Sequence, residues 1–181
     1  RDEVKTELAV AKSDPKQWFL TNLNAAKPGW AKQGTSRTRA DAMAELEAMC
    51  ARLAARRMSP AEHAILMATH LACKQARDDA DSDAYFYKNE EFHQQIYIGS
   101  KNTFLEDQAP ALRRRLRPYP RLQLRVRNRV TASFDEHGAV VDAIIEGKGE
   151  LAAELLRQHI MIQGQRFSDL VASLSELSSE A

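Results

Sequence analysis

The sequence predicts an all-α protein, an antiparallel bundle of six to seven helices. The chain is rich in Ala, Leu, Glu and Arg, which are strong helix formers. Apolar residues recur at spacings of three and four over most of its 181 residues. Glycine and proline are few, with 7 and 6 residues, and no Asn-Gly or Asp-Gly pair marks a β-hairpin. The 44% hydrophobic content is ample for one compact core.

The regular helical pattern does not begin at the first residue. We expect an irregular segment over residues 1–36, with one short helix that Pro28-Gly29 ends. The main helical domain is expected over residues 37–175. Residues 176–181 are expected to form a disordered tail.

Two helices open the main domain. The first runs from Thr38 to about Met58. Ser59 caps the second, with Pro60 in its first turn and Glu62 closing a capping box. In the first helix, apolar residues recur at spacings of three and four: Ala42, Leu46, Met49, Cys50, Leu53 and Ala54. In the second helix, the residues expected to face inward are Ile65, Leu66, Leu71 and Cys73.

The third and fourth helices follow closely. The third is expected over residues 83–98, because Asp81 or Ser82 can cap it and Gly99 ends it. Asn102 starts the fourth, which contains Pro110. We expect a kink at this proline, because it removes a hydrogen bond and clashes with the preceding turn.

The sequence of the last part of the domain predicts three more helices. One covers residues 121–130, and Ser133 caps the next. A Gly-Lys-Gly sequence at 147–149 breaks that helix. The final helix runs from Glu150 to about Leu174.

Composition and charge narrow the functional classes. The net charge of +1 indicates no particular partner. The two cysteines lie among apolar residues and are expected to be reduced and buried, as in a cytoplasmic protein. No run approaches 18 apolar residues, so no membrane span is expected.

Three of the five histidines lie beside apolar stripes on three different helices. Asn89 and His93 are four residues apart and so share one helix face, while His137 and His159 lie far downstream. A lone histidine on an apolar face is usually a hydrogen-bonded core residue, but three of them in one small bundle also indicate a shared metal site. The other two histidines are expected to be surface or hydrogen-bonded polar residues: His63 and His70.

Residues 38–174 resemble the FCD domain, the C-terminal effector-binding domain of FadR-type regulators in the GntR family. The resemblance is carried by the helical stretch at 43–57, by Asn89-Glu90-Glu91-Phe92-His93, and by Glu136-His137 with a histidine 22 residues further on. It implies that an Asp-x-x-x-His pair and two later histidines bind a divalent metal, with Zn²⁺ or Ni²⁺ expected. The metal would help to hold a small organic acid. The implied metal ligands here are Asn89, His93, His137 and His159.

This sequence departs from the family pattern at Asn89, where aspartate is commonest. An amide lacks the charge that would offset a buried divalent ion, so we expect weak metal binding that a carboxylate effector strengthens. Two alternatives stay open. Glu90 could supply the charged ligand, or the histidines could hold an anion without metal.

Eight arginines crowd residues 113–129, with no acid between Asp107 and Asp135. They could form a solvated face, clamp an effector carboxylate from inside, or contact nucleic acid. If they turn inward, Arg113 and Arg117 are the candidates for binding the ligand, being one turn apart.

The resemblance implies a non-enzymatic sensor within a homodimeric, DNA-binding regulator of transcription. Regulators of this type carry an N-terminal winged helix, which is not recognisable in residues 1–36. The main alternative is a histidine-rich metalloenzyme of hydrolase type, with Glu90 or Glu136 as its only evident general base. A purely structural bundle is a third possibility.

Overall fold

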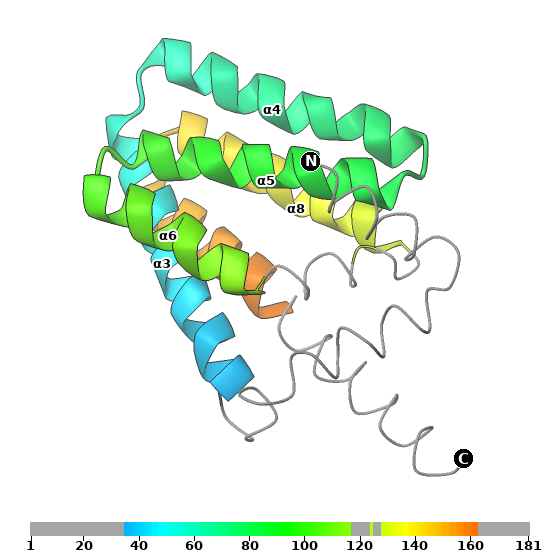
Figure 1. Cartoon of the computed structure of the whole chain (residues 1–181). Coiled ribbons are helices and arrows are strands. Elements are labelled where there is room, and N and C mark those ends of the chain that lie inside the picture. The colour runs from blue at the N-terminus through cyan, green and yellow to red at the C-terminus, as the bar shows by residue number, and fades with distance from the viewer. Residues whose placement is uncertain (1–34, 117–123, 125–127, 163–181) are drawn as a thin grey trace. The chain divides into compact units, whose positions relative to one another are not determined.

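The structure, a computed structural model, describes residues 35–116, 124 and 128–162 (Figure 1). All regular secondary structure within these residues is helical, which confirms the all-α fold class. No helix in this part of the chain is long and apolar enough to cross a membrane. The short N-terminal helix, most of the helix expected at 121–130, Arg117 and the C-terminal tail lie outside the described residues.

The first two described helices are α3 (Thr35–Arg57) and α4 (Pro60–Asp78). The capping box between them is confirmed. The Ser59 hydroxyl accepts a hydrogen bond from the Glu62 backbone, and the Glu62 carboxylate accepts one from the Ser59 backbone at 2.9 Å.

The next two helices are α5 (Ser82–Gly99) and α6 (Thr103–Leu116). The Asp81 carboxylate caps α5 by accepting hydrogen bonds from two backbone amides in its first turn. Pro110 lies inside α6, and the helix continues past it to Leu116.

The last two helices are α8 (Arg129–Ile145) and a helix over residues 149–162, drawn in orange in Figure 1. The start of α8 differs from the prediction, because Ser133 is buried inside the helix and does not cap it. Asn128 occupies the cap in a left-handed conformation, with φ of 63°. The predicted break is confirmed at Gly147, whose φ is 72°.

Helix α4 packs against α5 and α8 on one side, and α5 packs against α6 (Figure 1). The main core lies between the helices and is built from aromatic, aliphatic and many alanine side chains. Small residues dominate the buried face of α3, which lets neighbouring helices approach closely.

Two apolar residues of α4 were expected in the core and are not there. Ile65 is 51% exposed and Leu71 is 54% exposed. The side of α4 that α5 and α8 cover carries His70 together with Leu66 and Cys73, which were expected to face inward and do. Helical periodicity identified the apolar residues, but it did not indicate which face of the helix the neighbours would cover.

Candidate metal centre

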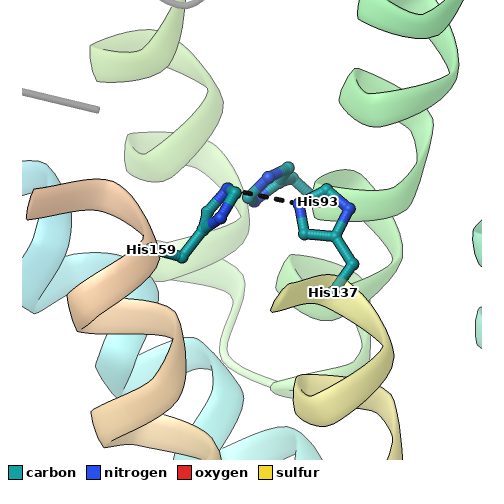
Figure 2. A group of neighbouring side chains, drawn as sticks. All are labelled: His93, His137 and His159. Carbon is teal, nitrogen blue, oxygen red and sulfur yellow. Dashed lines mark hydrogen bonds between the residues drawn. The ribbon is translucent and has the colours of Figure 1, made fainter. Parts of the chain in front are cut away.

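The three histidines singled out in the sequence meet in the interior of the bundle. His93 comes from α5, His137 from α8 and His159 from the helix over 149–162 (Figure 2). Each of them offers a ring nitrogen, and these atoms lie within 4.8 Å of one another. All three side chains are at most 1% exposed. Residues separated by up to 66 positions thus form one compact group of imidazoles.

Local packing fixes the ring of His137. The Phe92 ring stacks on it, with centroids 4.3 Å apart and an interplanar angle of 21°. The Nε2 atoms of His137 and His159 lie 3.2 Å apart. Because Phe92 precedes His93 on α5, one helix supplies both a ligand candidate and the packing for a second.

Two glutamates orient two of the rings. The Nδ1 atom of His93 lies 2.5 Å from the Glu47 carboxylate on α3. The Nδ1 atom of His159 lies 2.5 Å from the Glu136 carboxylate on α8. A carboxylate at Nδ1 fixes the proton there and leaves Nε2 as a lone-pair donor. Carboxylate–histidine pairs of this kind commonly support metal ligands in proteins.

Each of these glutamates is held in turn by a buried arginine. Glu47 accepts a hydrogen bond from Arg113 Nη1 at 2.7 Å, and Arg113 Nε donates to Glu90 at 2.5 Å. Arg129 donates both of its terminal nitrogens to Glu136, each at 2.7 Å. Arg113 and Arg129 are only 4% and 2% exposed.

The electrostatics keep the imidazoles neutral and the carboxylates charged. Burial lowers the pKa of His159 to about 4 and holds the pKa of His137 well below its usual range. Burial alone would raise the pKa of Glu47, but His93 and Arg113 lower it to about 2. The pKa of Glu136 is also lowered to about 2, because its bonds to His159 and Arg129 outweigh its burial. Neutral imidazoles are the form that binds a metal.

Several buried polar atoms of this region have no hydrogen-bond partner within the described part of the chain. They include His93 Nε2, the Asn89 side-chain oxygen and Arg113 Nη2. The first two are electron-pair donors, and Asn89 lies one turn before His93 on the same face of α5. The set of donors therefore fits a divalent ion of borderline hardness, such as Zn²⁺ or Ni²⁺. The part of Asn89 in the site stays a prediction.

The structure also shows where other candidate residues lie. Arg113 does turn inward, but its first partners are Glu47 and Glu90. Glu90, considered as a charged ligand, is thus tied to an arginine. His70 was expected to be a surface or hydrogen-bonded polar residue, but it is buried and stacks on Phe134 at 4.2 Å.

Sequence reasoning missed the supporting roles of Glu47, Glu136 and Arg129. The signal for Glu47 was present, since it lies among buried residues of α3: Ala44, Ala48 and Ala51. A glutamate with apolar neighbours three and four positions away is rarely buried without a charged partner. That signal could have marked Glu47, although it could not have named His93 or Arg113 as the partners.

Comparisons with known proteins agree with this fold. The family model for the FCD domain matches residues 39–161, about two thirds of the chain. One similar solved structure is the GntR protein of Streptococcus agalactiae, with a TM-score of 0.58 and 19% sequence identity. The alignment covers 76% of this chain and 63% of that one, so the chain spans less than two thirds of that protein. A comparison with curated proteins finds no match. The family model confirms the resemblance drawn from the sequence, and this chain belongs to the FCD-domain family of effector-binding regulatory domains.

Proposed function

We propose that this domain senses a small carboxylate through a divalent metal, and that it regulates DNA binding by a dimeric transcription factor of the GntR type. The ligands proposed for the metal are His93, His137, His159 and the Asn89 oxygen. The observation that carries the proposal is the group of three buried, neutral imidazoles whose ring nitrogens lie within 4.8 Å of one another. The bound metal would act as a Lewis acid toward a carboxylate oxygen.

The charges around the histidines favour a ligand with a single negative charge. Three glutamates and two arginines form the hydrogen-bonded groups described above: Glu47, Glu90, Glu136, Arg113 and Arg129. Their net charge is minus one, so a divalent ion would leave the region at plus one. One carboxylate would then bring it to neutrality, which lowers the cost of burying the ion.

Arg113 offers a second contact for the same carboxylate. Its Nη2 atom is buried and lacks a hydrogen-bond partner in the described residues. A buried guanidinium nitrogen without an acceptor is costly, and a carboxylate oxygen would satisfy it. Arg117, the other arginine predicted to bind the ligand, belongs to the part of the chain not described.

The alternative of a hydrolytic metalloenzyme has less support. It requires a carboxylate that accepts a proton, and the candidates were Glu90 and Glu136. Glu90 is paired with Arg113, and the pKa of Glu136 is lowered to about 2. A carboxylate with so low a pKa is a poor general base near neutral pH. Both glutamates instead suit a binding site with fixed charges.

Calorimetric titration tests the proposal. The chain would be stripped of metal and titrated with Zn²⁺ or Ni²⁺, alone and with acetate or lactate present. We expect the acid that fits to tighten metal binding by at least about tenfold, by the reciprocity of linked equilibria. The matched control is His63→Ala, at a histidine of α4 outside the group. Equal metal affinity in wild type and His93→Ala would show that the histidines do not bind it.

A further inference from the structure

Helix α4 presents an apolar face to solvent. Its covered side packs on α5 and α8, and no other described helix packs on the opposite side (Figure 1). Between residues 61 and 72, every exposed residue of α4 is apolar: Ala61, Ala64, Ile65, Ala68, Leu71 and Ala72. The polar residues of the same stretch are half-buried or buried: Glu62, His63, Thr69 and His70. This arrangement is the reverse of a solvated helix and marks an interaction surface.

The pattern on this face is symmetric about Ala68. Ile65 and Leu71 lie three residues to either side, and Ala64 and Ala72 lie four residues to either side. If two copies of α4 pack antiparallel about a two-fold axis at Ala68, Ile65 of one copy meets Ala72 of the other. Leu71 likewise meets Ala64, and Ala68 meets its own equivalent. Each large side chain therefore packs over a small one, and the face is complementary to itself, as a two-fold interface requires.

The charges at the two ends of α4 favour the same partner and the same direction. Basic residues are exposed near its start, namely Arg57 at the end of α3 and Lys101, and Lys101 pairs with Glu62 in the first turn. Acidic residues are exposed just past its end, namely Asp79 and Asp81. An antiparallel pair brings the basic start of one α4 near the acidic end of the other. A parallel pair would instead place like charges together.

We propose that this face of α4 binds the same face of a second copy of the chain, antiparallel, with the two-fold axis at Ala68. The helix has 19 residues and is about 28 Å long, so the pairing extends from the basic end to the acidic end. This interface would hold together the dimer of the proposed function. The inference rests on the proposed function only because both expect a dimer. Its test requires neither metal nor effector.

The oligomeric state of the whole chain tests the proposal. Light scattering coupled to size exclusion should give twice the 20.4 kDa mass of one chain. Ala68→Glu places two carboxylates face to face at the axis and should raise the dimer dissociation constant at least about 100-fold. The matched control is Ala42→Glu, at an exposed alanine of α3, which should remain dimeric.

A crosslinking experiment tests the axis itself. Ala68→Cys brings two new thiols together, so a short bismaleimide should join two chains, whereas Ala42→Cys should not be joined. The native thiols, Cys50 and Cys73, are buried and should not react. A monomeric wild-type chain, an Ala68→Glu dimer as tight as wild type, or equal crosslinking at both positions would overturn the inference. None of these results would change the metal titration, so the two proposals fail separately.

Discussion

Replacing Glu47 with glutamine should weaken metal binding by about 10–100-fold, because the carboxylate orients His93. It should also lower the free energy of unfolding by about 3 kcal/mol. Glu47 is fully buried and uses one oxygen for His93 and the other for Arg113. A glutamine has a single acceptor oxygen, so its amide nitrogen must face one of these two donors.

The magnitude follows from these contacts. A buried donor left unsatisfied costs about 1–3 kcal/mol, and breaking a buried ion pair costs about 3–5 kcal/mol. Arg113 keeps Glu90 as a second partner, which places the expected loss at the lower end of that range. For a chain of this size, a loss of 3 kcal/mol corresponds to a fall in Tm of about 6–12 °C.

Urea unfolding followed by circular dichroism measures the free energy of unfolding, and a competition titration of Zn²⁺ against a chelator measures metal binding. The control is Glu45→Gln, two residues earlier on α3. Glu45 pairs with Arg157 at the surface, and its side chain is 66% exposed, so the change should cost under about 1 kcal/mol. If Glu47→Gln bound Zn²⁺ as tightly as Glu45→Gln does, Glu47 would not orient a metal ligand, and the reasoning would be wrong.

Three further outcomes are expected. Asn89→Asp should tighten Zn²⁺ binding by at least about tenfold in calorimetry, because it adds a charge beside the buried ion, and unchanged affinity would remove Asn89 from the site. In the metal-free protein, His159 has a pKa of about 4 when folded and an ordinary value of 6.5 when unfolded. The contribution of His159 to the free energy of unfolding should therefore be fully present above pH 6.5. The free energy of unfolding should fall by up to about 3 kcal/mol toward pH 4, as measured by urea melts with EDTA present. A flat profile would contradict the buried neutral imidazole. Ser59→Ala should cost about 1 kcal/mol in the same melts, since α4 loses its capping box, and Ser59→Thr should retain most of it.

The helix ends could be predicted where a side chain caps the backbone locally. Ser59 and Glu62 gave the start of α4 because both partners lie within one turn. The predicted start of α8 was wrong, because Asn128 occupies the N-cap with a left-handed backbone and makes no side-chain hydrogen bond to the helix. Asparagine adopts this conformation only sometimes, so its residue type alone does not mark the boundary.

The ligand histidines could be predicted, but the residues behind them could not. His93 carries its own signal, four residues after Asn89 and next to Phe92 on an apolar face. The role of Glu47 depends on Arg113, which lies 66 residues away along the chain and on another helix. Periodicity reports which face of a helix is apolar, and it contains no information on such distant pairing. The prediction that Ile65 faces inward was wrong for the same reason, because its exposure depends on where α5 and α8 lie.

The position of Glu47 on α3 has a mechanical consequence. The helix is continuous from Thr35 to Arg57, and Glu47 lies 12 residues after its start, a distance of about 18 Å. An unbroken helix behaves as a stiff rod over that length. If a ligand shifts His93, the buried bond shifts Glu47, and the beginning of α3 must move as well. On the proposed function, a ligand that moves His93 would therefore also displace the residues that join this domain to the preceding part of the chain.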